Sequence, residues 1–560
     1  MIQPVSTESP TLGIPKVTLS KSHLDDLDVA GRISLLRECC QQVIGHSREW
    51  VDAACQAKGI PDGSPSRAEE ISTGPIATAR FLRLLELTLR DIEEKGKPIL
   101  PGSPRSNNFG KLEVPVIPEK RLYDSLVFTG FQAKAIMQSG INLENFDSSL
   151  APQYRGGEKS TGRIALVLGA GNVSSIPATD SLSKIFLENC AVLLKMNPVN
   201  EYLGNIFEKS FSPLVNRGLL QIIYGGAEAG AAAIELPEVE TVHITGSIEA
   251  HDAIVWGPSE GRNERIDSNS PVLKKVITSE LGNVSPWIVV PGPYSEKELA
   301  FQAENIVSSI TNNASFNCIA TKVILTWKGW DQRDKFLGKV QSILNRVPRR
   351  KAYYPGACDR YNQYAEEPVQ LDSKGALPWT LLTGLSTDAP EKYFQRESFV
   401  CVTVEVPLEA ASEEEFLEKA VQFANEKTWG TLGVSLTVHP KFRKKGSNED
   451  LFQKALADLK YGTVAINQWA GLAFAMMSLP WGGYPGQPLT DIQSGTGWVH
   501  NSYMLDGVEK SVMEGPLTIF PKPIWFPTHK NPEPVAWRLL ELYDKPGIWN
   551  LLRLIKASIL

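Results

Sequence analysis

Cys318 is the residue whose type and surroundings most favour covalent chemistry. It lies in the run 312–321, N-N-A-S-F-N-C-I-A-T, where small and amide-bearing neighbours leave room for a ligand and supply hydrogen-bond donors. A cysteine attacks as its thiolate, and a free thiol with a pKa of about 8.5 needs a base or a positive field to ionise. A lone cysteine is more often an inert core thiol, so the rest of the sequence has to decide between the two interpretations.

Glu280 is the second candidate, because it follows a predicted buried strand in the sequence S-E-L-G-N. A carboxylate at such a position is costly unless it is solvated or partnered, and such placements often mark acid–base groups. A helix cap or an ion pair explains the pattern equally well. Only one predicted strand and one predicted helix separate Glu280 from Cys318, so the two side chains could face one cleft.

Three glycine-containing turns follow predicted strands. They are G-A-G-N at 169–172, G-G-A-E-A-G at 225–230 and T-G-S at 245–247. Backbone N–H groups at such turns can hold a phosphate. A single G-x-G is weak evidence, but three such turns at strand ends of one sheet favour a dinucleotide site.

The elements that must position these residues form an α/β pattern from residue 163 onward. Near-continuous apolar strands are predicted at 163–168, 191–196, 219–224, 241–245, 275–279 and 286–290, with short helices between the first few. This pattern predicts a parallel sheet with helices on both faces, which binds ligands beyond the carboxyl ends of its strands. The residues at those ends are Asn172, Lys195, Gly226, Thr245, Gly246, Ser247 and Glu280.

A second α/β region is predicted from 291 to 490. Its strands lie near 322–327, 401–406, 433–437 and 462–466, and Cys318 falls between a helix at 298–310 and the first of these strands. Residues 256–271 predict a surface loop and residues 508–520 a late strand. Towards the N-terminus, 24–58 and 74–95 predict helices and 97–120 a Pro/Gly-rich connection. We identify no chemistry in residues 1–150 and interpret them as scaffold.

Composition restricts the class of protein. A chain of 560 residues is too long for one core, so we expect two or three domains. The formal net charge of −6 gives no reason to expect nucleic acid, whose binding proteins carry clustered basic surfaces. Seven cysteines are scattered without paired or metal-ligand spacing, which predicts a reducing compartment and no metal site. Residues 1–10 lack the pattern of a secretory signal, so a cytoplasmic location is predicted.

Taken together, seven short stretches resemble the aldehyde dehydrogenase superfamily, whose members are NAD(P)-dependent and use a nucleophilic cysteine. The stretches occur in the family's order: G-N at 171–172, L-K-M-N-P at 194–198, I-T-G-S at 244–247, E-L-G-N at 280–283, C-I-A at 318–320, E-S-F at 397–399 and P-W-G-G-Y at 480–484. No single stretch is specific, but together they are.

The resemblance implies an α/β fold with a Rossmann-like doubly wound parallel sheet for the coenzyme and a second α/β catalytic domain. The implied domains are 1–290 for the N-terminal helices and the coenzyme, with an oligomerisation excursion near 135–161, and 291–490 for catalysis. Residues 491–520 would form a small oligomerisation or bridging element, and 521–560 an amphipathic C-terminal extension. A homodimer or homotetramer is expected.

The resemblance also implies roles. Cys318 looks like the nucleophile, Asn172 like a side-chain donor to the oxyanion, and Glu280 like the general base that hydrolyses the thioester. The residues implied for NAD or NADP are Lys195, Gly226, Gly230, Thr245, Gly246, Ser247, Leu281, Glu397 and Phe399. Phe316 and Trp481 would line the pocket for a small-molecule aldehyde.

Several alternatives remain open at this stage. Pro198 stands where many NAD-preferring members carry an acidic residue, so the choice between NAD and NADP is open. Glu280 favours hydrolysis to a carboxylic acid over an acyl-CoA or acyl-thioester reductase, and a non-catalytic scaffold is the third reading. Residues 521–560 would lie on a membrane, gate a pocket for an apolar or long-chain aldehyde, or pack at a subunit contact.

Overall fold

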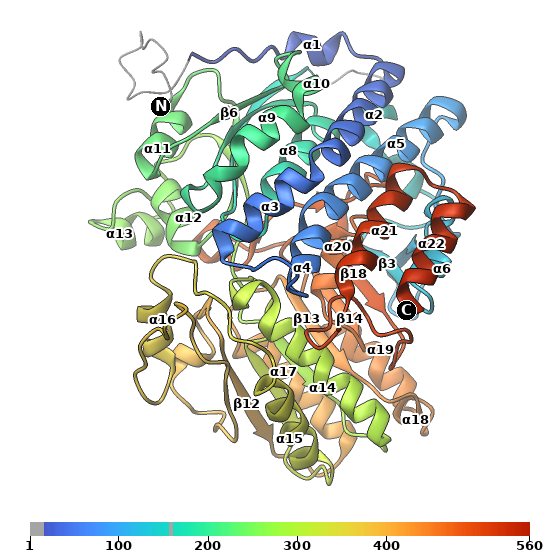
Figure 1. Ribbon diagram of the computed structural model, residues 1–560, viewed down its shortest axis with the longest axis vertical. Coiled ribbons are helices and arrows are strands. Elements are labelled where there is room, and N and C mark those ends of the chain that lie inside the picture. Colours follow the sequence, from blue (N-terminus) through green and yellow to red (C-terminus); the bar gives the residue numbers. More distant parts are fainter. Residues whose placement is uncertain (1–15, 156–160, 560) are drawn as a thin grey trace.

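The computed structural model describes residues 16–155 and 161–559 (Figure 1). Residues 1–15, on which the prediction of no secretory signal rests, lie outside the described residues, as do residues 156–160 of the predicted oligomerisation excursion. Within the described ranges, no helix is both long enough and apolar enough to cross a lipid bilayer.

A six-stranded sheet forms the first half of the molecule. Its order is β16 (Gly495–Thr496), β8 (Val276–Glu280), β7 (Thr241–Thr245), β4 (Arg163–Leu168), β5 (Cys190–Lys195) and β6 (Leu220–Ile223). All neighbours are parallel except β16, which runs antiparallel to β8. The predicted parallel sheet is therefore confirmed. Between Arg163 and Lys195 at their ends, the strands β4 and β5 are apolar, because α8 (Ile176–Phe186) and other helices cover the sheet.

A ten-stranded sheet forms the second half. Its order is β1 (Arg105–Ser106), β2 (Leu112–Ile117), β3 (Gln132–Met137), β18 (Val508–Glu514), β14 (Thr463–Ile466), β13 (Gly433–Thr437), β9 (Pro286–Val289), β10 (Val323–Trp327), β12 (Val402–Leu408) and β11 (Thr380–Leu382). The strands from β18 to β11 are parallel, while β1, β2 and β3 add an antiparallel edge.

Two sequence predictions about strands are wrong. Residues 286–290 do not continue the first sheet, because β9 pairs with β10 and β13 in the centre of the second. An apolar run fits either sheet equally well, so its composition could not decide. The connection predicted at 97–120 contains β2, which accommodates Pro115 beside an irregularity in its pairing with β3. Residues 105–137 therefore join the second sheet, although the predicted boundary at 290 assigns them to the first half.

Helices at the N-terminus pack on the six-stranded sheet. The predicted helix at 24–58 divides at His46 into α2 (Val29–Gly45) and α3 (Ser47–Lys58). The next helical run comprises α4 (Arg67–Ile71), the π-helical turn η1 (Ser72–Ile76) and α5 (Ala77–Lys95). Gly59 and Gly96 end α3 and α5 in the left-handed conformation, which glycine adopts without strain.

The helix before Cys318 is α14 (Glu296–Thr311), which begins with a capping box between Ser295 and Glu298. Before the C-terminal extension, the other described helices of eight or more residues are α11 (Ala227–Glu235), α12 (Ile248–Val255), α15 (Arg333–Leu344), α16 (Ala357–Tyr364), α17 (Glu413–Glu426) and α19 (Asn448–Asp458). The predicted loop 256–271 contains one short helix, α13 (Arg262–Asp267).

The C-terminal extension forms two helices, α21 (Pro532–Asp544) and α22 (Ile548–Ile559). In Figure 1 they lie beside the N-terminal helices, and α21 contacts α4, η1 and α5. The C-terminal extension therefore packs against helices from the N-terminal part of the chain. Residues 491–520 contribute β16 to the first sheet and β18 to the second, so this segment links the two halves.

Candidate active site

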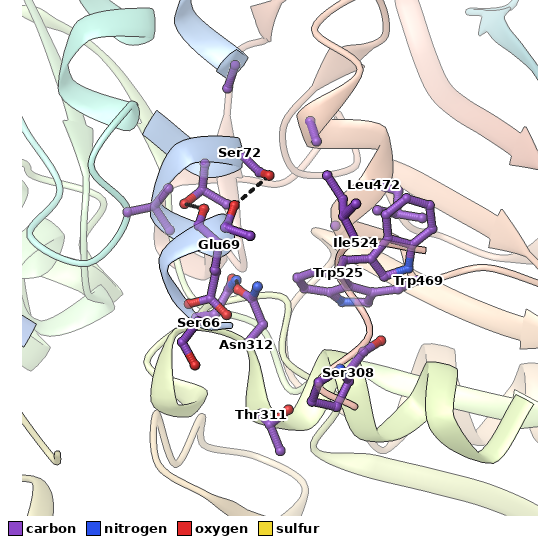
Figure 2. A pocket seen from close by; sticks show the side chains of 18 of the residues that line it. Ser66, Glu69, Ser72, Ser308, Thr311, Asn312, Trp469, Leu472, Ile524 and Trp525 are labelled. Carbon is purple, nitrogen blue, oxygen red and sulfur yellow. Dashed lines mark hydrogen bonds between the residues drawn. The ribbon is translucent and has the colours of Figure 1, made fainter. Parts of the chain in front are cut away.

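Two cavities meet at Cys318 and Glu280, which line both of them. The wide cavity has a volume of about 1640 Å³ and lies at the carboxyl ends of β4, β5, β7 and β8. The narrow cavity has a volume of about 420 Å³ and lies among the N-terminal helices, α14 and the C-terminal extension (Figure 2). The candidate nucleophile and the candidate base thus stand where two ligands could meet.

The loop that carries Cys318 is strained. After α14, the three consecutive residues Asn313, Ala314 and Ser315 have φ angles of 52°, 55° and 69°. Left-handed conformations cost energy in residues other than glycine, and they persist only where surrounding contacts impose them. We call residues 312–318 the nucleophile loop.

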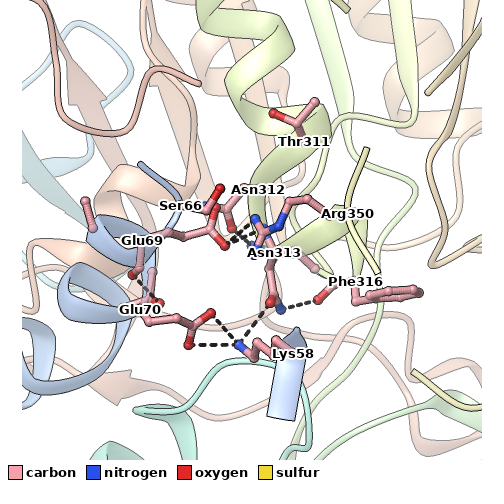
Figure 3. A network of polar contacts seen from close by, with 12 residues as sticks. Lys58, Ser66, Glu69, Glu70, Thr311, Asn312, Asn313, Phe316 and Arg350 are labelled. Atoms are coloured by element: carbon pink, nitrogen blue, oxygen red, sulfur yellow. Dashed lines mark hydrogen bonds and ion pairs between the residues drawn. The ribbon is translucent and has the colours of Figure 1, made fainter. Parts of the chain in front are cut away.

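A buried polar network imposes this conformation (Figure 3). Lys58 Nζ donates to Glu70 Oε1 at 2.8 Å and to Asn313 Oδ1 at 3.0 Å. The Asn313 backbone N–H donates to Glu69 Oε1, which also accepts from Arg350. The helices α3 and α4, which the sequence analysis interpreted as scaffold, therefore contact the nucleophile loop. No motif in residues 58–70 signals this role.

Asn172 braces the same loop from the first sheet. Its Nδ2 donates to the Phe316 carbonyl at 3.1 Å, and its own carbonyl accepts from Asn313 Nδ2 at 3.0 Å. Because an amide NH₂ carries two hydrogens, one is left for a ligand oxygen. Tyr353, a residue that the sequence did not indicate, donates its hydroxyl to the Asn172 carbonyl as well.

The sulfur of Cys318 lies 4.0 Å from Glu280 Oε1 and 3.8 Å from Asn317 Oδ1. Burial, followed by the nearby carboxyl groups of Glu280 and Glu397, raises the pKa of the thiol well above its usual range. Burial and the charge of Asp180 raise the pKa of Glu280 to about 8. At neutral pH both groups are therefore protonated, and the thiol needs a nearby acceptor or a positive charge to react.

Glu280 is held by one hydrogen bond. Trp481 Nε1 donates to its Oε1 at 2.9 Å, while Oε2 is buried without a hydrogen-bond partner among the described residues. A buried oxygen with no partner is costly. Glu280 lines both cavities, so a ligand or a water molecule there could satisfy this oxygen.

The wide cavity is lined by every residue that the sequence assigned to a cofactor. These are Lys195, Gly226, Gly230, Thr245, Gly246, Ser247, Leu281, Glu397 and Phe399, and Asn172 lines it as well. Two side chains have other partners there. The Thr245 hydroxyl donates to Asp180 Oδ2 at 2.8 Å, and Ser247 caps the start of α12. These two therefore offer the cavity mainly their backbone.

Lys195 and Glu397 are the ionisable side chains that the sequence assigned to this cavity. Burial lowers the pKa of Lys195 and raises that of Glu397 to about 8. Glu397 Oε1 is buried without a hydrogen-bond partner among the described residues. A side chain at Gly282 would place its Cβ only 2.1 Å from the other oxygen, Oε2, so this approach requires glycine. The orphaned oxygen and the close approach of the backbone fit a polar cofactor.

Trp481 lines the narrow cavity as predicted, but Phe316 lines neither cavity. Phe316 follows the left-handed turn and packs behind the nucleophile loop. Its ring centroid lies 5.1 Å from that of Tyr353 and 5.7 Å from that of Tyr354. The structure therefore places Phe316 away from both cavities, and its contact with the substrate stays a prediction. The left-handed turn changes the direction of the backbone before Phe316, and the sequence of side chains does not indicate that change.

The C-terminal extension supplies part of the narrow cavity. Ile524 and Trp525 line it together with Trp469 and Leu472, and Figure 2 shows these side chains around it with Glu69. Leu539 and Tyr543 of α21 line it too. The sequence left three contacts open for residues 521–560: a membrane, a pocket or another subunit. The structure of the single chain shows the contact with a pocket.

Comparison with known proteins gives consistent results. The model of the aldehyde dehydrogenase family matches residues 168–505. An aldehyde dehydrogenase from Enchytraeus buchholzi is 25% identical over 343 residues, which cover 57% of this chain and 62% of that relative, less than two thirds of its length.

Solved structures share the fold at low identity. The NAD-dependent aldehyde dehydrogenase of Sinorhizobium meliloti superposes with a TM-score of 0.56 at 17% identity, covering 90% of this chain and 86% of that one. The glyceraldehyde-3-phosphate dehydrogenase of Methanocaldococcus jannaschii, complexed with NADP, gives 0.56 at 15% identity, covering 89% and 92%. This likeness confirms the predicted α/β fold.

Proposed function

The chain belongs to the aldehyde dehydrogenase family, and we propose that it oxidises an aldehyde to a carboxylic acid with NAD or NADP. One observation carries the proposal. Cys318 and Glu280 lie 4.0 Å apart, sulfur to oxygen, at the junction of a wide polar cavity and a narrow, mostly apolar one. A nucleophile and a base at such a junction suit a reaction between an aldehyde and a coenzyme that enter from different sides.

The residues of the chain would act in two stages. In the first, the Cys318 thiolate bonds to the aldehyde carbon, and the oxyanion is received by the free amide hydrogen of Asn172 and the Cys318 backbone N–H. Removing one such donor in other acyl-transfer sites costs about 10²–10³ in rate. The bound coenzyme supplies the acceptor for the hydride that leaves this carbon, so a thioester on Cys318 remains.

In the second stage Glu280 takes a proton from a water molecule. The water oxygen bonds to the thioester carbon, the carbon–sulfur bond breaks, and Cys318 leaves as a thiolate. Glu280 stands beside the sulfur, within reach of a water molecule that attacks this carbon. This proximity supports hydrolysis over the alternative, transfer to or from coenzyme A, in which water has to be kept from the thioester. It also argues against a scaffold without activity.

The coenzyme would occupy the wide cavity. We assign Lys195 and Glu397 to its riboses, the glycine turns at Gly226 and Gly246 to its phosphates, and Phe399 to the nicotinamide end. The partnerless Glu397 oxygen supports this assignment, since a ribose hydroxyl could donate to it. Both NAD and NADP remain candidates, because Pro198, which also lines the cavity, favours neither.

The narrow cavity supports a large apolar aldehyde as the substrate. Its walls include Trp469, Leu472, Phe474, Ile524 and Trp525. Burial of such surface against an apolar ligand contributes about 25 cal/mol per Å². An aromatic or long-chain aldehyde would fill this cavity, whereas a small polar one would leave these walls without contacts.

Helix α22 supports a further finer assignment, contact with an anionic membrane surface. Its exposed face carries Ile548, Trp549, Leu552, Ile555 and Ile559, with Trp549 76% exposed. Arg553 and Lys556 are exposed beside this face, and the helix contains no acidic residue. If two copies of the chain packed through this face, the basic side chains of the two helices would lie close together and repel each other. The helix contains no carboxylate to neutralise them. An anionic bilayer satisfies both the apolar and the basic side chains. The predicted homo-oligomer and cytoplasmic location stay predictions.

Coenzyme reduction with NAD and with NADP, measured for short, aromatic and long-chain aldehydes, tests the proposal. We expect turnover in the wild type, none in Cys318→Ala, and in Glu280→Gln a burst of reduced coenzyme followed by a stall. Turnover that survives in Cys318→Ala would refute the mechanism. Turnover that requires coenzyme A would favour the acyl-thioester alternative.

A further inference from the structure

A line of polar side chains, all buried except the half-buried Thr278, runs from Glu280 between helix α8 and the six-stranded sheet. Its members are Asp180 and Lys184 on α8, His243 and Thr245 on β7, and Thr278 and Glu280 on β8. Residues four apart share a helix face, and residues two apart share a sheet face. The β7–β8 register sets His243 beside Thr278 and Thr245 beside Glu280. A contact between a helix and a sheet is normally apolar, so this line requires an explanation.

Hydrogen bonds connect the line from Lys184 to Asp180. Lys184 Nζ donates to Thr278 Oγ1 at 2.9 Å, and that oxygen lies 2.9 Å from His243 Nδ1. The other ring nitrogen, Nε2, lies 3.3 Å from Thr245 Oγ1 and 3.6 Å from Asp180 Oδ2. The Thr245 hydroxyl donates to the same Asp180 oxygen at 2.8 Å.

The chemistry of the groups fixes the direction of these bonds. The Thr245 hydroxyl gives its hydrogen to Asp180 Oδ2, so Nε2 of His243 faces only acceptor atoms there and carries the ring proton. Nδ1 is then an acceptor, and Thr278, whose oxygen accepts from Lys184, turns its own hydrogen towards it. Every donor therefore points along the line towards the Asp180 carboxylate, which is 1% exposed. Such donors stabilise the negative charge of a buried carboxylate.

We propose that Asp180 is a positioning residue of the hydrolytic step: its carboxylate, towards which this line of donors points, makes Glu280 a stronger base towards the attacking water. The inference rests on the proposed function. Water gives its proton to Glu280 and its oxygen to the acyl carbon as Cys318 leaves, and Asp180 exchanges no proton. In agreement with this role, the charge of Asp180 is, after burial, the second cause that raises the pKa of Glu280. A base is most effective with a pKa near the working pH.

The other groups around this carboxyl pair are few among the described residues. Cys318 faces Glu280 from the nucleophile loop, and Trp481 donates to it from β15 (Pro480–Trp481). His500, on β17 (Val499–His500), is close enough to Asp180 to feel its charge, but burial lowers its pKa to about 4 and keeps it neutral. The cations of the line, Lys184 and any protonated His243, lie on the far side of Asp180. Asp180 is therefore the carboxylate beside Glu280 that a substitution can remove without touching the nucleophile: its partner Thr245 pairs with Glu280 in the strand register.

The decay of an acyl-enzyme measures the step directly. p-Nitrophenyl acetate would acetylate Cys318 without coenzyme, and the loss of acetyl mass would be followed over about pH 6 to 10. We compare wild type with Asp180→Asn and with Thr245→Val, which removes one donor to Asp180 and keeps the shape of the side chain. Thr241→Val is the matched control, because this buried threonine lies on the same strand and its hydroxyl has no described partner.

In Asp180→Asn we expect the pH at which the decay rate rises to shift to a lower value by about one pH unit. The shift arises because a neighbouring like charge has been removed. Thr245→Val should move it in the same direction by less, and Thr241→Val should match the wild type. No shift in either Asp180→Asn or Thr245→Val, with normal acetylation, overturns the inference and leaves the proposed function intact. If Glu280→Gln loses acetyl as fast as the wild type, the proposed base itself is wrong, and the inference falls with it.

Discussion

The sulfur of Cys318 lies 4.0 Å from Oε1 of Glu280, although the two residues belong to different sheets. Glu280 ends β8 of the six-stranded sheet, and Cys318 lies on the loop before β10 of the ten-stranded sheet. The reacting pair therefore exists only when both halves are folded and in contact. The N-terminal helices and the C-terminal extension hold this contact from one side, which ties the chemistry to distant parts of the chain.

The raised pKa of Glu280 predicts a pH-dependent stability. The buried carboxyl binds its proton up to about pH 8, whereas in the unfolded chain it loses it near the ordinary value of 4.5. Its contribution to stability is full below pH 4.5 and is lost as the pH rises through about 8. Glu280→Gln should therefore gain a few kcal/mol over the wild type at pH 9 and little at pH 5, measured by denaturant unfolding. Glu260→Gln, at an exposed position, is the control. An equal difference at both pH values would contradict the prediction.

The pair of Lys58 and Glu70 predicts a separation of stability from activity. Glu70→Leu leaves the Lys58 charge buried with only Asn313 as a partner, which should cost about 3–5 kcal/mol. Adding Lys58→Met removes that charge and should recover most of the stability. The rate of Cys318 acylation should stay low in the double variant, because Asn313 has lost the Lys58 hydrogen bond that holds the nucleophile loop. A double variant that acylates like the wild type would show that this hold is unnecessary.

The C-terminal extension predicts a change of substrate preference. Trp525→Ala removes an apolar wall of the narrow cavity, so KM for long-chain or aromatic aldehydes should rise about tenfold, equivalent to roughly 1.4 kcal/mol. Acetaldehyde, which is too small to reach this wall, should be affected little. Phe520→Ala is the matched control, because Phe520 directly precedes the extension and is 86% exposed. Equal effects on large and small aldehydes would argue against Trp525 as a substrate contact.

The exposed face of α22 predicts binding to anionic vesicles. Wild-type protein should sediment with phosphatidylglycerol vesicles and less with phosphatidylcholine vesicles, and salt should weaken the binding. The double variant Trp549→Ser/Leu552→Ser should stay in solution without loss of fold, because the packing residues Leu551 and Leu554 are unchanged. Leu143→Ser, 59% exposed elsewhere, should bind like the wild type. Protein that ignores vesicles but changes its oligomeric state in the double variant would identify a second copy as the occupant.

Local sequence carried the α/β class, the strands that end at the wide cavity, and the pairing of Cys318 with Glu280. Apolar strands that alternate with helices can bury both faces only in a covered parallel sheet. Small and glycine residues at the ends of those strands indicate close approach by a ligand. Such signals come from a few adjacent residues, so they can be seen in the chain itself.

Tertiary structure decided what depends on contacts between distant segments. The apolar sequence of β9 is compatible with either sheet, and only its pairing with β10 and β13 assigns it to the ten-stranded sheet. Phe316 is turned away by a loop whose left-handed conformation Lys58 and Glu69 impose from over 200 residues earlier. Trp525 and Asp180 acquire roles only because folding brings them to the site. A side chain's type fixes the chemistry it can do, but its partners and its solvent exposure, which set its pKa and its reach, belong to the folded whole.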